Sequence, residues 1–346
     1  MNDHKTQPAQ TPSAATVPRT GSAVDALPAC VVLLGPTAVG KSAIAVAVAA
    51  AAGGEIVSLD SMQVYRHLDI GTAKPTAAEQ QGIPHHLLNV VDPAAPFSAA
   101  EYARIARGVL HDIHARGRLP IVVGGSGLYL RALRGEIFSG PGEVAPIRAR
   151  LRAEVERSGA DALHARLTGL DPCVAARVHP RDAFRLIRAL EIIEVTGRRV
   201  SELWEAHRKE LHQPPLLLVG LRRERSMLYR RINERVDRML AAGLMEEGER
   251  LLNAGYPPDM KSLRGHNYRH IVGVLLGRLD LHEAVRRTKQ DTRHYAKRQM
   301  QWFKRNKEIH WFSPTERNFQ KLVTKLILKF LTRPNVPFRY GQGTLG

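Results

Sequence analysis

Short apolar runs alternate with longer amphipathic segments along the first half of the chain. Residues 29–34, 55–59 and 119–123 are apolar runs of strand length, and residues 86–91 are a further candidate strand. Residues 42–52 and 98–115 have the apolar spacing of helices, and the second of these begins with Ser98 as an expected N-cap. This alternation predicts an α/β fold built on a doubly wound parallel sheet, which binds ligands at the carboxyl ends of its strands.

The pattern changes near residue 140. Residues 143–213 are rich in arginine and helical in period, and the next strand-like run is 215–221. Helical patterns then cover residues 226–252, continue through Trp302, and return over residues 319–331. The predicted parts are a disordered leader (1–27), the first part of a sheet core (28–142), a helical insertion domain that contacts the ligand (143–213), the second part of the core with basic helices (214–315), and a C-terminal tail (316–346).

Charge is the compositional feature that changes this picture. The 346 residues include 51 Lys and Arg against 33 Asp and Glu, which gives a formal net charge of +18. Such an excess favours a polyanionic partner such as nucleic acid, although a solvated basic surface explains it equally well.

Cysteine usage and hydropathy exclude several classes of protein. Cys30 and Cys173 are the only cysteines, so the chain offers neither a disulfide framework nor a cysteine-based metal finger, and a cytoplasmic location is expected. No apolar run approaches the roughly 20 residues needed to span a bilayer. The N-terminal segment lacks the hydrophobic stretch of a signal peptide. We therefore expect no contact with a membrane, and a monomer by default.

Residues 35–42, with the sequence GPTAVGKS, match the phosphate-binding P-loop pattern between a strand-like run and a helix. The glycines let successive backbone N–H groups wrap a phosphate, and the helix N-terminus adds its positive end. Lys41 is expected to contact phosphate oxygens, and the Ser42 hydroxyl is expected to bind Mg²⁺. The predicted site for a diphosphate, or for a nucleotide such as ATP, comprises Gly35, Pro36, Thr37, Ala38, Val39, Gly40, Lys41 and Ser42.

A carboxylate lies at an unusual place beside this P-loop. Many P-loop enzymes hold their metal with an Asp at the end of a nearby strand, whereas residues 119–123 are followed by Gly124, Gly125 and Ser126. Asp60 instead follows the run 55–59, where a metal ligand, a general base and a helix N-cap are all consistent with its position. These motifs leave open a small-molecule kinase and an enzyme that transfers another group and releases diphosphate.

Longer motifs extend over nearly all of residues 31–312. They include SLDSMQVYRHLDIGTAKP (58–75), VVGGSGLYLRAL (122–133), RDAFRLIRALEI (181–192), SLRGHNYRHIV (262–272) and TRHYAKRQMQWF (292–303). With these motifs in this order, the sequence resembles the tRNA dimethylallyltransferases, also called tRNA isopentenyltransferases. The first two motifs are far more specific to that family than the P-loop is.

The resemblance implies transfer of a dimethylallyl group from dimethylallyl diphosphate to N6 of adenosine 37, in the anticodon loop of tRNAs that read codons beginning with U. The P-loop would hold the departing diphosphate with Mg²⁺, and Asp60 would be the general base toward the amino group. Thr37 and Ser126 would place the diphosphate and the nucleotide. Arg235 would clamp the diphosphate, although its position fits a helix-surface ion pair equally well. The retained P-loop residues and Asp60 argue against a third candidate, a non-catalytic RNA-binding P-loop protein.

The tRNA contacts implied by the resemblance are spread over the whole chain. They are Asp60, Ser61, Met62, Gln63, Ser126, Arg148, Phe184, Arg185, Leu186, Ile187, Arg188, Arg264, Gly265, His266, Asn267, Tyr268, Arg269, Arg293, Lys297 and Arg298. For residues 184–188 the spacing alone favours an amphipathic helix with a solvated arginine face. The sequence departs from the family pattern at His266 and Asn267, where an apolar residue followed by glycine is usual.

Basic residues gather between residues 286 and 307. Arg293 and Lys297, together with Arg286 or Lys289, have helical spacing, so we expect a positive helix face near the RNA backbone. The interleaved aromatic residues Tyr295 and Trp302 are expected to belong to the core.

Overall fold

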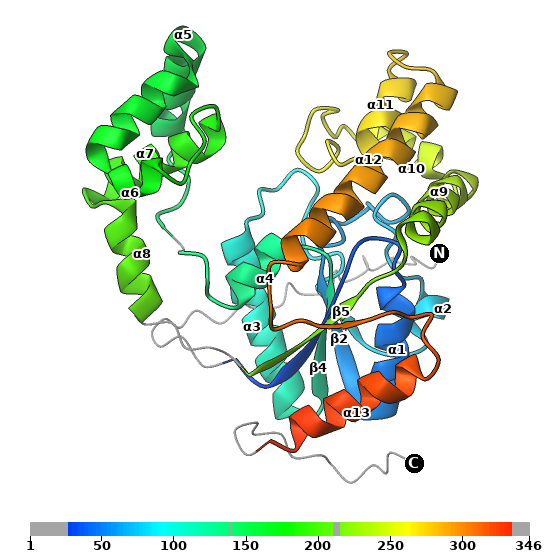
Figure 1. Cartoon of the computed structure of the whole chain (residues 1–346). Coiled ribbons are helices and arrows are strands. Elements are labelled where there is room, and N and C mark those ends of the chain that lie inside the picture. The colour runs from blue at the N-terminus through cyan, green and yellow to red at the C-terminus, as the bar shows by residue number, and fades with distance from the viewer. Residues whose placement is uncertain (1–26, 139, 210–214, 334–346) are drawn as a thin grey trace, which may run out of the picture.

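The computed structural model describes residues 27–138, 140–209 and 215–333 (Figure 1). Of the predicted leader, only residue 27 is described. Residues 210–213 of the predicted insertion and residues 334–346 of the predicted C-terminal tail also lie outside the described residues. In chain order the elements are β1 (Cys30–Leu34), α1 (Lys41–Ala52), β2 (Gly54–Leu59), α2 (Ala77–Gln80), β3 (His85–His86), α3 (Ala99–Ala115), β4 (Leu119–Gly124), α4 (Gly127–Leu133), α5 (Ala145–Leu170), α6 (Pro172–Ala175), α7 (Ala183–Thr196), α8 (Val200–Lys209), β5 (Leu216–Leu221), α9 (Arg225–Ala241), α10 (Leu244–Asn253), α11 (Tyr268–Leu275), α12 (Leu281–Phe303), β6 (His310–Phe312) and α13 (Phe319–Leu331).

The strands form one six-stranded parallel sheet in the order β3-β2-β4-β1-β5-β6. Val32 of β1 lies opposite Val122 of β4 and Leu218 of β5. Every residue of β1 is buried, because helices cover both faces of the sheet and leave no polar face along the strand. The doubly wound parallel sheet predicted from the alternating pattern is therefore confirmed.

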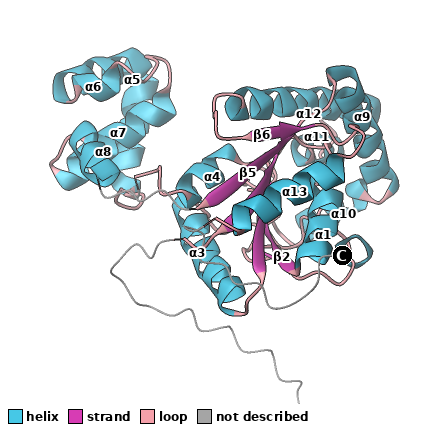
Figure 2. Ribbon diagram, turned by 60° about the horizontal axis from the view of Figure 1, so that its bottom comes forward, coloured by secondary structure: helices cyan, strands magenta, loops and turns pink. Residues whose placement is uncertain are grey.

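Two hydrophobic clusters cover the two faces of the sheet. On one face α1 and α13 pack on the strands through residues such as Val46, Val323 and Ile327, and Figure 2 shows α13 lying across the strands. On the other face α3 and α4 contribute Leu110 and Leu130. The predicted N-cap of α3 is confirmed, because the Ser98 hydroxyl accepts a hydrogen bond from the backbone N–H of Glu101.

Several predicted elements have different bounds in the structure. The strand expected over residues 86–91 is only β3, because Leu87 and Asn89 have φ values of 62° and 58° that break an extended strand. The helix expected over residues 226–252 is divided into α9 and α10 at Gly243, which has a φ of 96°. Strand β6 was not predicted, whereas α13 occupies the predicted residues 319–331.

Helices α5 to α8 form a group of their own between β4 and β5, coloured green in Figure 1. Their hydrophobic cluster, which includes Leu151, Leu167 and Leu190, is separate from the two clusters on the sheet. These helices correspond to the insertion expected over residues 143–213. In the described part of the chain, no helix is both long and apolar enough to cross a bilayer.

Candidate active site at the carboxyl edge of the sheet

The P-loop connects the end of β1 to the start of α1 at the centre of the sheet. Gly35 has a φ of 150°, and a Cβ atom there would lie 2.7 Å from the carbonyl oxygen of Leu221, so the turn requires glycine. The Lys41 Nζ donates hydrogen bonds of 2.9 Å to the carbonyl oxygens of Gly35 and Pro36. The pKa of Lys41 falls to about 8, mainly because the side chain is buried; the charge of Arg235 also lowers it, and the charge of Asp60 opposes the shift.

Side chains from distant segments hold the P-loop in place. The backbone N–H of Thr37 donates to Oε1 of Gln299 at 2.9 Å. Arg223 Nε donates to the carbonyl oxygen of Val39, and Arg231 Nε donates to that of Ala38, each at 2.9 Å. The backbone conformation of the loop is therefore set by α9, by α12 and by the segment between β5 and α9, as well as by its own sequence.

Asp60 follows β2 directly and is partly buried. Its Oδ1 accepts hydrogen bonds from the backbone N–H groups of Met62 at 2.8 Å and Gln63 at 3.3 Å, so it closes the turn after the strand. In the described part of the chain, its Oδ2 has no hydrogen-bond partner. The Asp60 charge raises the pKa of Lys41 and of Arg235, so the carboxylate interacts electrostatically with both cations.

Arg235 is the second cation of this group. Its partly buried side chain projects from α9, and desolvation lowers its pKa, a shift that Asp60 opposes. Its guanidinium makes no hydrogen bond or ion pair within the described ranges. A desolvated cation without a partner is typical of a site that receives an anionic ligand.

The Gly–Gly–Ser segment after β4 packs tightly against this group. A Cβ atom on Gly125 would lie 2.1 Å from Nε2 of Gln299, which donates a hydrogen bond of 3.0 Å to the Gly125 carbonyl oxygen. Ser126 is the N-cap of α4, but its hydroxyl makes no capping hydrogen bond. The structure thus places Thr37, Ser126 and Gln299 around one segment of the carboxyl edge.

The loop that follows Asp60 is anchored to α10 and α11. The buried Glu247 carboxylate accepts hydrogen bonds from the backbone N–H groups of Asp69, Ile70 and Gly71, and from the Tyr268 hydroxyl at 2.5 Å. The Gln63 amide donates within the same loop, to the carbonyl oxygens of residues 72 and 73. Tyr268 is almost fully buried, so its side chain belongs to this anchor and does not face solvent.

Among the other predicted contacts of this region, Arg264 before α11 and Arg269 within α11 are exposed. Arg264 approaches Asp259 at 3.8 Å, whereas Arg269 pairs closely with Asp291. Asn267 has a φ of −87° and a ψ of −31°, so the backbone needs no glycine here despite the departure from the family pattern.

The basic residues of α12 divide into those held by an acidic or amide side chain and those that are not. Arg286 and Arg287 both pair with Glu283 at 2.6 Å, Lys289 pairs with Asp237 at 2.6 Å, and Arg293 donates to the Asn233 side chain at 2.8 Å. Lys297 and Arg298 are exposed and form no ion pair within the described residues. Tyr295 and Trp302 are partly buried. Trp302 packs against the hydrophobic cluster that contains Leu110 and Leu130, as expected.

In the helical insertion the structure separates exposed residues from packing residues. Phe184 is 75% exposed, and Arg185 is exposed beside it. Leu186 and Ile187, by contrast, are buried in the cluster of the insertion, so their side chains pack there and do not reach a partner.

The two remaining arginines predicted in the insertion are held by an acidic side chain. Arg148 donates to Glu191 at 2.9 and 3.0 Å, and Arg188 donates to the same carboxylate at 2.7 Å. The guanidinium groups of Arg148 and Arg188 are thus engaged inside the domain.

Sequence reasoning missed the side chains that support the site. Arg223 and Arg231 lie in an arginine-rich stretch where nothing in the spacing distinguishes them from surface cations. Glu247 occupies the apolar side of α10, and a carboxylate on a buried helix face is the signal that indicates a buried anchor. Gln299 lies in the motif TRHYAKRQMQWF, yet its partners are 174 and 262 residues away.

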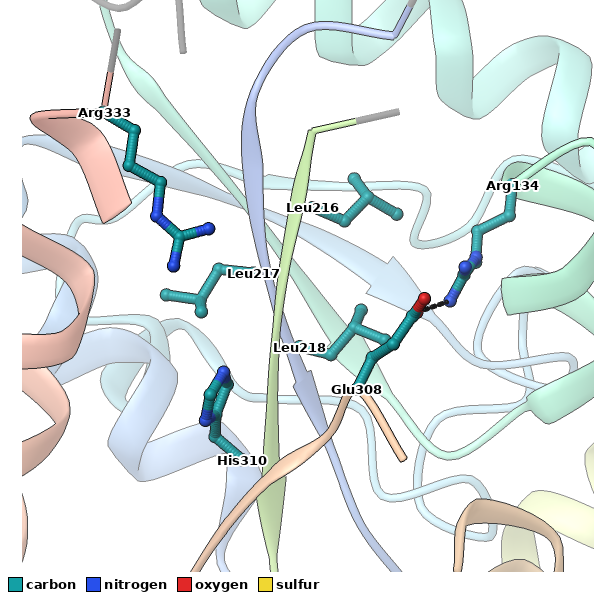
Figure 3. Close-up of a pocket in the computed structure, with 7 residues that line it drawn as sticks. All are labelled: Arg134, Leu216, Leu217, Leu218, Glu308, His310 and Arg333. Carbon is teal, nitrogen blue, oxygen red and sulfur yellow. Dashed lines mark hydrogen bonds and ion pairs between the residues drawn. The ribbon is translucent and has the colours of Figure 1, made fainter. Parts of the chain in front are cut away.

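A cavity of about 250 Å³ lies beside the first half of β5 and is separate from this site. Its lining includes Leu216 and Leu218, together with Arg134 and Glu308, which pair at 2.7 Å (Figure 3). Leu221, the last residue of β5, contacts the P-loop at Gly35. The cavity lies at the opposite end of the same strand.

A P-loop beside a carboxylate and a second cation, without an Asp at the end of β4, is typical of a group-transfer enzyme with a site for an anionic group. The family described as IPP transferase matches residues 63–306. The tRNA dimethylallyltransferases of Geobacter metallireducens and Geobacter sulfurreducens are 49% and 47% identical to this chain, over 81% and 87% of it and over 91% and 96% of their own lengths. The chain therefore belongs to the tRNA dimethylallyltransferase, or IPP transferase, family.

Solved structures agree with this assignment. The crystal structure of the tRNA isopentenylpyrophosphate transferase from Bacillus halodurans has a TM-score of 0.65 and 40% identity, covering 88% of this chain and 96% of that chain. A eukaryotic dimethylallyltransferase, described as acting on tRNA, has a TM-score of 0.78 and 27% identity, covering 92% of this chain and 82% of its own.

Proposed function

We propose that this protein transfers a dimethylallyl group from dimethylallyl diphosphate to N6 of adenosine 37, in the anticodon loop of tRNAs that read codons beginning with U. Membership of the family makes it a prenyltransferase that acts on tRNA. The observation that carries the proposal is the position of Asp60, whose charge acts on both Lys41 and Arg235. A carboxylate and two cations that interact with it are what a base beside a diphosphate site would require.

Departure of the diphosphate is the first task of the site. Backbone N–H groups of the P-loop, Lys41 and Arg235 would stabilise the negative charge that develops as the allylic C–O bond breaks. Ser42 is exposed at the start of α1, where its hydroxyl would supply one ligand to Mg²⁺. This single ligand fits Mg²⁺, which keeps several waters and takes other oxygens from the phosphates, and which neutralises charge on the leaving group.

Activation of the amine is the second task. As the N6 nitrogen bonds to the allylic carbon, the C–O bond to diphosphate breaks and one N6 proton passes to the Asp60 carboxylate. Oδ2 suits this role, because Oδ1 is engaged by the turn. The Thr37 and Ser126 hydroxyls would orient the diphosphate and the nucleotide, since an amine with a delocalised lone pair depends on orientation.

The tRNA would lie along the exposed cations. Lys297 and Arg298 on α12 and Arg185 with Phe184 on α7 would contact the anticodon stem-loop from two elements. The modified base would leave its stack to reach Asp60, as in other enzymes that act on bases. We propose that the protein acts on free tRNA in the cytoplasm as a monomer.

One assay tests the proposed function. The protein is incubated with labelled dimethylallyl diphosphate, Mg²⁺ and unmodified tRNA with adenosines at positions 36, 37 and 38. Label is expected to enter the tRNA at adenosine 37, and its absence would contradict the proposal. Phosphorylation that depends on ATP would instead indicate the small-molecule kinase, which the Gly–Gly end of β4 disfavours.

A further inference from the structure

His266 lies in the loop before α11 and packs against Tyr295 of α12. The ring centroids are 4.9 Å apart with an angle of 32° between the planes. The side chain is partly buried, yet neither ring nitrogen makes a hydrogen bond within the described part of the chain. Both ring nitrogens can therefore form hydrogen bonds with a ligand.

Charged groups from several elements face His266. Asp60, after β2, and Asp291, on α12, raise its pKa, whereas Arg235 on α9 and Arg269 on α11 lower it. Burial is the largest effect, and the pKa of His266 falls to about 4. At neutral pH the imidazole is therefore uncharged and offers one N–H donor and one acceptor nitrogen.

The backbone around His266 is fixed by its neighbours. The Asn267 Nδ2 donates a hydrogen bond of 2.6 Å to the carbonyl oxygen of Gly71, and the buried Tyr268 hydroxyl bonds to Glu247. One ring face is covered by Tyr295. The imidazole is thus held in place before any ligand binds. It lies near the turn that Asp60 closes, because a Cβ atom on the preceding Gly265 would lie 3.1 Å from Cε of Met62.

We propose that His266 determines base specificity in the acceptor pocket, where its imidazole N–H donates a hydrogen bond to a ring nitrogen of the adenine whose amino group donates to Asp60. Adenine carries an acceptor nitrogen, N1 or N7, on each side of its amino group, so a neighbouring donor and acceptor recognise it together. Guanine would present an oxygen to the Asp60 carboxylate and be rejected. An apolar residue, usual in the family at this position, makes no such bond. The inference rests on the proposed function, since it takes adenine as the acceptor.

The test combines side-chain and base substitutions. Wild-type protein, His266→Leu and His266→Gln are assayed on tRNAs that carry adenosine, 1-deazaadenosine or 7-deazaadenosine at position 37. On the adenosine tRNA we expect His266→Leu to lower kcat/KM roughly tenfold, the loss of one good contact to a base edge. On one deaza tRNA the wild-type rate should fall and the penalty for His266→Leu should disappear, because the accepting nitrogen is gone. His266→Gln should recover part of the rate through its amide donor.

Equal losses for His266→Leu on all three tRNAs, or no loss on any, would overturn the inference. His282→Leu, at the exposed start of α12, is the matched control and should match the wild type on every tRNA. Unchanged binding of dimethylallyl diphosphate by His266→Leu would show that the variant is folded. Failure of the wild type to modify the adenosine tRNA would instead contradict the proposed function itself.

Discussion

At the scale of single residues, Asp60 closes a turn, and under the proposed function the same carboxylate also acts as the base. Oδ1 closes the turn after β2, and Oδ2 is available to the acceptor amine. We expect Asp60→Asn to keep the turn, because its amide oxygen still accepts the two backbone N–H groups, and to lower kcat roughly 100-fold through loss of the base. Parallel measurements of kcat and of tRNA affinity check this, and an equal loss of both would show that Asp60 acts mainly in binding.

His266 also makes the stability of the protein depend on pH. Its folded pKa of about 4 lies below the ordinary value of 6.5, so the unfolded chain binds more protons between these pH values. The free energy of unfolding should therefore fall as the pH is lowered from 6.5 toward 4. His266→Leu lacks this contribution. Denaturant titrations between pH 6.5 and 4 should therefore show a smaller decrease in its free energy of unfolding than in that of the wild type. If the free energy of unfolding changed equally with pH in the two proteins, the low pKa of His266 would be contradicted.

Residue types and spacing predicted the parts of the site that are contiguous in sequence. The P-loop needs only Gly35, Gly40, Lys41 and Ser42 in a row between a strand and a helix, so a pattern reveals it. The hydrogen bond from Arg231 to Ala38 spans 193 residues, and the one from Thr37 to Gln299 spans 262. Such contacts depend on packing across the whole sheet, which local spacing does not encode.

At the scale of elements, α12 presents only part of its charge to a ligand. Lys297→Ala with Arg298→Ala should weaken tRNA binding and reduce the slope of log affinity against log salt by roughly one to two units, because two phosphate contacts are lost. Arg286→Ala with Arg287→Ala is the matched control, since Glu283 already pairs with both cations. If both double variants had the same slope of log affinity against log salt, the tRNA would bind to another surface of the protein.

Helix α9 supports the P-loop from outside the phosphate site. Arg231 donates to the Ala38 carbonyl, whereas the neighbouring Arg230 points to solvent and approaches Glu234 only at 4.0 Å. Arg231→Met should leave this carbonyl without its partner and raise the Kd for dimethylallyl diphosphate by roughly tenfold, the loss of a charge-assisted hydrogen bond. Arg230→Met should bind the donor like the wild type in calorimetry. Similar affinities for both variants would remove the support assigned to Arg231.

At the scale of the whole molecule, the segment predicted as a C-terminal tail contributes to the core. Phe330 of α13 is buried on the sheet, whereas Leu322 on the same helix is 45% exposed. Phe330→Ala should lower the free energy of unfolding by about 3 kcal/mol, as expected for a large cavity in a core. Leu322→Ala should change it little, and denaturant unfolding of the two variants checks the contrast. Equal stability would show that α13 packs only loosely.

The architecture as a whole followed from the hydrophobic pattern, and its exceptions have local causes. Strand β1 and its neighbours β4 and β5 are buried on both faces, so each is a continuous apolar run that a sequence pattern detects. Strand β6 escaped detection because its three residues, HWF, are exposed or partly buried at the sheet edge and carry no such run. The short β3 ends where positive φ angles at Leu87 and Asn89 turn the chain.

The strand order has a consequence for how the protein is made. β1 lies between β4 and β5, and the whole helical insertion separates these two strands in sequence. A ribosome that has released β1 and its P-loop must therefore translate past Leu221 before the second neighbour of β1 exists, and past Gln299 before Thr37 is bonded. During this interval the insertion can fold on its own cluster while one edge of β1 stays unpaired. Slow translation of residues 125–221 would thus prolong exposure of the phosphate-binding strand to chaperones and proteases.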